Sequence, residues 1–146
     1  MTSPLLAVVP ARGDSVGVPG KALRPVAGVP MILRTLRTVE ESGVATRIVV
    51  STDCPRIASF CRLRGYEVLD RPSELALPDV PVIAAARHAV ETLGWGGDVA
   101  IFQPTSFRWP PSAAFWSIAG QHFRASQNSV KLLRKACAGW WRRFHQ

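Results

Sequence analysis

The sequence predicts an α/β fold built on a mostly parallel, doubly wound sheet. Short apolar runs alternate with segments of helical periodicity, and the first run is followed at once by a loop rich in glycine and proline. That first run is apolar at every position, as expected of a strand covered by helices on both faces. The length of 146 residues suits one domain with a sizeable core.

Four apolar runs predict the first four strands of this sheet. They lie near residues 5–9, 46–51, 66–69 and 98–103. A fully apolar strand at 5–9 belongs in the interior of the sheet. We therefore expect the loop at 11–22, which follows this strand, to lie at the carboxyl ends of the parallel strands.

Helical segments connect the predicted strands. The first begins at Pro30 and ends near Gly43, because proline suits a first helical turn and glycine suits the residue after a helix. Aspartate side chains are good helix caps. We expect Asp53 to cap the second helix and Asp79 to cap the third, which ends at Gly94.

The formal charge of +8 is concentrated near the end of the chain. Residues 1–98 contain eleven lysines and arginines against ten acids, whereas residues 99–146 contain seven basic residues and no acid. The excess basicity therefore belongs to one terminal segment rather than to the predicted α/β unit.

Cysteine usage and hydropathy exclude several classes. The three cysteines, Cys54, Cys61 and Cys137, are odd in number and lack metal-ligand spacing, so we expect neither a disulfide framework nor a zinc site. We interpret Cys54 and Cys61 as small core residues. No apolar run approaches the roughly 18 to 20 residues that cross a bilayer. We expect a cytoplasmic protein with no membrane partner.

The loop after the first strand has the composition of a phosphate-binding segment. It reads Pro10-Ala11-Arg12-Gly13-Asp14-Ser15-Val16-Gly17-Val18-Pro19-Gly20-Lys21. Glycines let backbone N–H groups approach phosphate oxygens, and arginine, lysine and serine side chains add charge and hydrogen bonds. The segment matches neither the P-loop nor the dinucleotide glycine pattern. An ordinary surface loop is the alternative.

The pattern Ala11-Arg12-Gly13-x-Ser15-x-Gly17-x-Pro19-x-Lys21 resembles the N-terminal signature of the acylneuraminate cytidylyltransferases, the CMP-sialic acid synthetases. The CMP-KDO synthetases are close relatives of that family. The resemblance continues in order through residues 23–30, 49–53, 71–76, 88–91 and 103–106. It therefore extends over residues 5 to about 108.

The resemblance implies a Rossmann-like fold and the transfer of CMP from CTP to an acidic sugar, with Mg²⁺ as cofactor and pyrophosphate as leaving group. The sugar would be sialic acid or a similar nine-carbon acid. Arg12 and Lys21 would be catalytic, because cations stabilise the charge on a leaving pyrophosphate. The implied nucleotide-binding residues are Ala11, Arg12, Gly13, Ser15, Gly17, Lys21, Arg71 and Gln103.

Some of these residues also have simple structural interpretations. Arg71 precedes a proline and could brace a turn, and Gln103 could cap the end of a strand. We interpret Asp53 as a helix cap rather than a catalytic acid, and His88 as a structural residue.

The loop also departs from the family pattern. Val16 stands where the family usually has lysine, and Ala22 stands where it has asparagine, while Asp14 replaces glycine or asparagine. Each of the first two losses would weaken CTP binding by about 1 to 3 kcal/mol if the contact is buried.

The resemblance fades after Ser106. The family's metal-binding carboxylates and dimerisation element are not matched, and the chain has no acid after Asp98. We therefore find no metal ligands and divide the chain into a nucleotide-binding part, 1–108, and a basic tail, 109–146. A truncated or frame-shifted product is one expectation. Such a chain would bind CTP weakly through Arg12 without turnover, and residues 126–146 would pack poorly or form an isolated basic helix.

Two other functions remain open. A guanylyltransferase or sugar-phosphate uridylyltransferase would also use a glycine-rich loop with arginine and lysine. A nucleic-acid-binding protein could place Lys131, Arg134 and Lys135 on one helical face, with Trp140 and Trp141 stacking on bases. We disfavour nucleic-acid binding, because the tail does not resemble a selected element.

Overall fold

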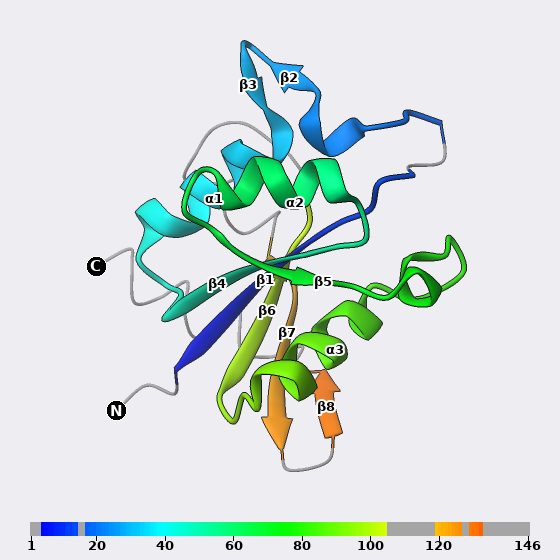
Figure 1. The fold of residues 1–146 in the computed structure, drawn as a ribbon. Coiled ribbons are helices and arrows are strands. Elements are labelled where there is room, and N and C mark those ends of the chain that lie inside the picture. The colour runs from blue at the N-terminus through cyan, green and yellow to red at the C-terminus, as the bar shows by residue number, and fades with distance from the viewer. Residues whose placement is uncertain (1–3, 15–16, 105–118, 127–128, 133–146) are drawn as a thin grey trace.

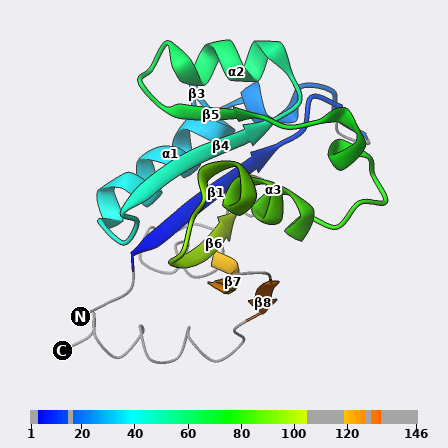
Figure 2. The same cartoon turned by 60° about the horizontal axis from the view of Figure 1, so that its bottom comes forward.

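The computed structural model describes residues 4–14, 17–104, 119–126 and 129–132, the last two ranges by their backbone alone (Figure 1). In this part of the chain the main sheet has six strands in the order β5-β4-β1-β6-β7-β8. Helices lie on both faces of the sheet, so the architecture has three layers, α/β/α (Figures 1 and 2). The predicted fold class is confirmed.

Four neighbouring strands of the sheet run parallel to one another. They are β1 (Leu5–Ala11), β4 (Arg47–Thr52), β5 (Glu67–Asp70) and β6 (Asp98–Phe102). β1 pairs with β4 on one side and with β6 on the other, and all seven of its residues are buried. The four predicted strands are confirmed within one or two residues at each end.

Two clusters of buried side chains hold the layers together. On one face, β1 packs against α1 (Met31–Ser42) and α2 (Pro55–Arg62). On the other, Leu6 and Val8 of β1 pack against Ala86 and Ala89 of α3 (Ile83–Leu93). Alternate residues of β1 face opposite layers, as the pleat of a strand requires.

The helix ends are partly as predicted. Gly43 and Gly94 end α1 and α3 in the left-handed conformation that glycine adopts readily.

The predicted caps at Asp53 and Asp79 are wrong. The cap residues are Cys54 and Val82, and neither cap makes a side-chain hydrogen bond. Asp53 instead accepts a hydrogen bond from the Gly13 amide, 40 positions away in the sequence. α3 begins at Ile83, later than a cap at Asp79 would place it. The reason is that Val80 precedes a proline, and a residue in that position is disfavoured in helical geometry.

Short elements flank the carboxyl edge of the sheet. The loop after β1 leads into η1 (Lys21–Leu23) and a small hairpin of β2 (Pro25–Val26) and β3 (Val29–Pro30). Arg34 of α1 donates two hydrogen bonds to the Val26 carbonyl oxygen, at 2.9 and 2.5 Å, and so fixes the hairpin to the helix. A second short helix, η2 (Ser73–Ala76), follows β5.

Two antiparallel strands extend the sheet beyond β6. β7 (Ala119–Ser126) pairs with β6, and β8 (Ser129–Leu132) pairs with β7. The expected poor packing or isolated helix over 126–146 is therefore wrong for the backbone of 129–132, which pairs in the sheet. Residues 133–146, with Arg134, Lys135, Trp140 and Trp141 of the tail, lie outside the described residues. The division at residue 108 stays a prediction.

The two described cysteines agree with the expected core role. Both are free thiols; Cys61 is buried and Cys54 is half-buried against the same apolar cluster. Burial raises the pKa of the Cys61 thiol to about 11, and the charge of Arg64 opposes this shift. Separately, none of the helices in the described ranges combines the length and hydropathy of a membrane span.

The junction before β6 provides a test of the packing. Gly97 is buried, and a Cβ atom there would collide with the carbonyl oxygen of Pro4 and lie 2.9 Å from its Cγ. We expect Gly97→Ala to lower the free energy of unfolding by about 1 to 3 kcal/mol, measured by urea denaturation. Gly96→Ala is the control, because a Cβ atom there meets nothing within 4 Å. Equal stability of the two variants would contradict this packing.

Candidate functional site

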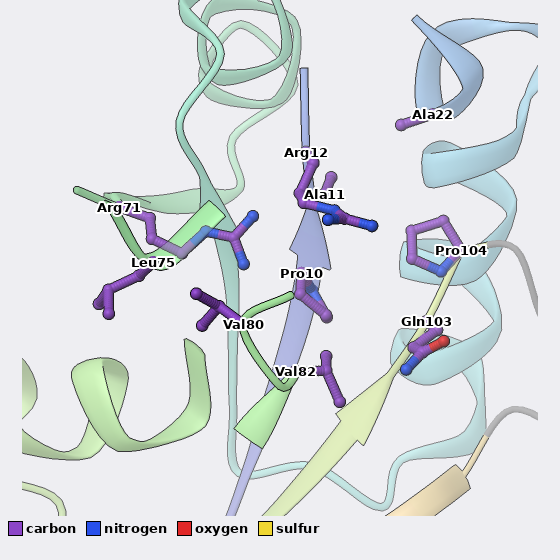
Figure 3. A pocket seen from close by; sticks show the side chains of 10 residues that line it. All are labelled: Pro10, Ala11, Arg12, Ala22, Arg71, Leu75, Val80, Val82, Gln103 and Pro104. Atoms are coloured by element: carbon purple, nitrogen blue, oxygen red, sulfur yellow. The ribbon is translucent and has the colours of Figure 1, made fainter. Parts of the chain in front are cut away.

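The strand order reverses between β1 and β6. From β1 the chain adds β4 and β5 on one side and then returns to add β6 on the other. In open α/β sheets, ligands bind beyond the carboxyl ends of the strands at such a point. A cavity of about 210 Å³ lies there (Figure 3). It is lined by Pro10, Ala11, Arg12, Ala22, Arg71, Leu75, Val80, Val82, Gln103 and Pro104.

Four parts of the chain supply these walls. Ala11 at the end of β1 and Arg12 directly after it form one part of the lining. Gln103, directly after β6, belongs to another part (Figure 3). η1 contributes Ala22, which is only 6% exposed. The segment between β5 and α3 contributes Arg71 together with apolar side chains. Two arginines and a glutamine thus share the cavity with apolar side chains.

Arg71 is the most unusual residue of the cavity. Its backbone N–H donates to the Thr52 carbonyl oxygen at 2.8 Å, which continues the pairing of β5 with β4 by one residue. Its side chain is only 3% exposed. Among the described residues, the Nε and Nη2 groups have no hydrogen-bond partner, and the nearest carboxylate oxygen, Asp53 Oδ1, is 4.0 Å from Nη2.

This burial has an electrostatic consequence. Loss of water around the guanidinium lowers the pKa of Arg71 from its ordinary value, while the charge of Asp53 raises it and the charge of Arg12 lowers it further. A buried cation without full compensation is unfavourable. A planar guanidinium with free N–H groups is suited to phosphate or other oxygen acceptors. The cavity is therefore built to accept an anionic or acceptor-rich ligand.

Arg12 supplies the second cation. Its side chain is half-buried, and Nη1 donates to the Ala76 carbonyl oxygen of η2 at 3.5 Å. This long hydrogen bond links the end of β1 to the segment that carries Arg71. The two guanidinium groups are close enough for the charge of Arg12 to influence Arg71.

The glycine loop after β1 turns tightly at its ends. A Cβ atom at Gly13 would lie 2.9 Å from the Cβ atom of Cys54, so the loop passes too close to the start of α2 for a side chain. The Gly20 amide donates to the Gly13 carbonyl oxygen at 3.4 Å and closes the loop. Gly17 and Gly20 have φ angles of 96° and 65°, which glycine tolerates best.

The structure brings together half of the residues predicted from the sequence. Ala11, Arg12, Arg71 and Gln103 all line the cavity. Gly13 lies beside it through its contact with Asp53, whereas Gly17 and Lys21 are not among the lining residues. Ser15 lies outside the described residues. The functional roles of all eight residues stay predictions.

Sequence reasoning missed two features of the site. The first is Asp53, whose carboxylate contacts the glycine loop instead of capping α2. The second is the apolar wall from the segment before α3, formed by Leu75, Val80 and Val82. The available signal for Asp53 was its place directly after a strand that pairs with β1.

The expected Mg²⁺ has no preformed cluster of ligating side chains among the described residues. No group of three or more His, Cys, Asp or Glu side chains gathers in the described ranges. Mg²⁺ prefers oxygen ligands in octahedral geometry. Asp53 is the carboxylate beside the cavity, but its Oδ1 already accepts from Gly13 and faces Arg71. We derive no catalytic step through the metal.

The topology and the cavity define an α/β domain with a positively charged ligand-binding site. This site lies at the switch point, the place where the strand order reverses between β1 and β6. Comparison with known proteins makes the assignment more specific. Residues 6–86 match the sequence model of the cytidylyltransferase family, and the chain belongs to this family. The match includes the glycine loop and Arg71.

Curated relatives match about half of the chain. The chain is 44% identical over 75 residues to the 3-deoxy-manno-octulosonate cytidylyltransferase of Bradyrhizobium sp. (strain ORS 278), an alignment that covers 49% of this chain and 30% of that protein. It is 47% identical over 77 residues to the enzyme of the same name from Alkalilimnicola ehrlichii, covering 50% of this chain and 29% of the relative. The chain thus spans about 30% of the length of these relatives.

A solved structure supports the fold independently. The structure of CMP:2-keto-3-deoxy-manno-octonic acid synthetase complexed with CTP superposes with a TM-score of 0.63 at 19% sequence identity. The superposition covers 76% of this chain and 44% of that protein. At this identity the similarity establishes the shared fold.

The buried and poorly compensated charge of Arg71 predicts a stability gain when it is removed. We expect Arg71→Met to raise the free energy of unfolding of the ligand-free protein by about 1 kcal/mol, because a buried and poorly compensated cation is replaced by an apolar side chain. The measurement is urea denaturation without nucleotide. Arg56→Met, at an exposed position of α2, is the control and should stay within about 0.5 kcal/mol of the parent. A loss of stability in Arg71→Met would show that the charge is already compensated.

Proposed function

We propose that this chain binds CTP in the cavity at the switch point and supplies the nucleotide site of a cytidylyltransferase. The observation that carries the proposal is the buried Arg71 guanidinium, whose Nε and Nη2 groups lack hydrogen-bond partners in the described structure. Membership of the cytidylyltransferase family supports it, and the fold is that of a synthetase solved with CTP. The cytoplasmic location expected from the sequence belongs to this proposal.

The roles of the individual residues follow from charge and position. Arg12 and Lys21 would neutralise the triphosphate, and the Ser15 hydroxyl and the amides of the glycine loop would add hydrogen bonds. Arg71 and Gln103 would contact the nucleotide from the two sides of the cavity (Figure 3). In transfer, the sugar hydroxyl oxygen would form a bond to the α-phosphorus and lose its proton to water. The bond from that phosphorus to the oxygen bridging the α- and β-phosphates would break, and pyrophosphate would leave with that oxygen. That the transfer requires Mg²⁺ stays a prediction.

For the acceptor we propose an eight-carbon acidic sugar of the 3-deoxy-manno-octulosonate type. The sequence signature resembles that of enzymes that use sialic acid, but the curated relatives are named for the eight-carbon sugar. Both sugars are acids with an anomeric hydroxyl group, so the proposal concerns the choice between two members of one chemical class.

Nucleotide binding gives the direct test. We expect calorimetric titration to show CTP binding that weakens by about ten- to a hundredfold in Arg12→Met and in Arg71→Met, because each loses a charge-assisted contact. Arg56→Met is again the matched control and should leave the affinity unchanged. Equal affinity of the parent for CTP, UTP and GTP would favour another sugar nucleotidyltransferase. Unchanged affinity in both cavity variants would contradict the proposed site.

The acceptor is tested by pyrophosphate release. With CTP and Mg²⁺ supplied, we expect more release with 3-deoxy-manno-octulosonate than with N-acetylneuraminate. Release with N-acetylneuraminate but not with 3-deoxy-manno-octulosonate would contradict the choice of the eight-carbon sugar. It would favour the sialic acid subtype implied by the signature.

A further inference from the structure

Three charged residues form a row across the carboxyl edge of the sheet. Ala11 of β1 is in register with Thr52 of β4, and Thr52 is in register with Asp70 of β5. The residue that directly follows each of these three positions in the chain is charged: Arg12, Asp53 and Arg71. Three neighbouring strands therefore present a cation, an anion and a cation at equivalent positions.

The central carboxylate contacts both sides of the site. Asp53 Oδ1 accepts a hydrogen bond from the Gly13 amide at 3.1 Å and lies 4.0 Å from Arg71 Nη2. Its side chain is 22% exposed, and it is not among the residues that line the cavity. Asp53 therefore acts on residues of the site without itself facing the ligand space.

We propose that Asp53 is a positioning residue of this site, whose carboxylate anchors the first amide of the glycine loop and lies beside the Arg71 guanidinium. The proposal rests on the proposed function, since it assigns to the nucleotide site a residue that acts through Gly13, Arg12 and Arg71. Asp53 does not cap α2, whose cap residue is Cys54.

The anchor has a clear physical basis. Gly13 follows Arg12 directly, so the hydrogen bond that fixes the Gly13 amide also limits where the Arg12 backbone can lie. A hydrogen bond to an ionised acceptor is stronger than one between neutral groups. A side chain at Gly13 would collide with Cys54, so the loop has little freedom to take another path over α2. The carboxylate and this steric contact together determine how the loop leaves β1.

The negative charge of Asp53 beside Arg71 has a second, electrostatic effect on the site. The charges of Arg12 and Arg71 repel one another, and Asp53 offsets this repulsion at Arg71. Before a ligand arrives, Asp53 is the negative charge nearest to the buried guanidinium. A phosphate group in the cavity would supply further negative charge without requiring Asp53 to move.

Two substitutions separate the anchor from the charge. Asp53→Asn keeps a side-chain oxygen that can accept from Gly13 but removes the charge, whereas Asp53→Ala removes both. We expect Asp53→Asn to bind CTP within about twofold of the parent or more tightly, with a lower melting temperature. We expect Asp53→Ala to bind CTP about ten- to a hundredfold more weakly, because the loop loses its anchor.

Hydrogen exchange at the Gly13 amide, followed by NMR, tests the anchor without any ligand. The amide should be protected in the parent and in Asp53→Asn, and should exchange at least about tenfold faster in Asp53→Ala. Protection of the Val8 amide in the buried strand β1 reports whether each variant is folded. Asp70→Ala is the matched control, because Asp70 pairs with the exposed Arg62 and should affect neither measurement.

The outcomes are distinct. Equal weakening of CTP binding in Asp53→Asn and Asp53→Ala would overturn the anchor and attribute the effect to charge. Unchanged Gly13 exchange in Asp53→Ala would also overturn the anchor. If the parent chain bound no CTP, the proposed function would fail, and the Gly13 exchange would still support or overturn the anchoring role of Asp53.

Discussion

Parallel pairing of β1 with β4 on one side and β6 on the other is the constraint on which the rest of the structure depends. Parallel strands end at the same edge of a sheet, so residues that are distant in sequence meet there. The register of β1, β4 and β5 aligns Arg12, Asp53 and Arg71, and the pairing with β6 brings Gln103 to the other wall. The cavity is a consequence of where these four strands stop.

Much of this arrangement could be predicted from the sequence. The apolar run of β1 indicated a strand buried on both faces, and the glycines at positions 43 and 94 marked the ends of two helices. The loop after β1 was placed correctly at the carboxyl edge, and four of the predicted site residues share one cavity. These features depend on local patterns or on the general geometry of parallel sheets.

The features that sequence reasoning missed depend on long-range contacts. Asp53 stands before a helix with proline at its first turn, and the local pattern favours a cap; its actual partner, Gly13, belongs to another strand end. The burial of Arg71 depends on a segment of irregular backbone between β5 and α3, which has no periodicity to indicate its path. Residues 129–132 were assigned to a basic tail because of their composition, although their backbone pairs with β7.

The pairing of Leu5 with Asp98 joins the first strand of the chain, β1, to the last of the parallel strands, β6. Contacts of such large sequence separation form at a high entropic cost and slow the folding of a domain. A partly folded chain containing only β1, β4 and β5 would already hold Arg12, Asp53 and Arg71 at one edge, but it would lack the wall that follows β6. The cavity is thus completed only with the last of the parallel strands. Ligand binding therefore reports on the assembled sheet and not on its first half.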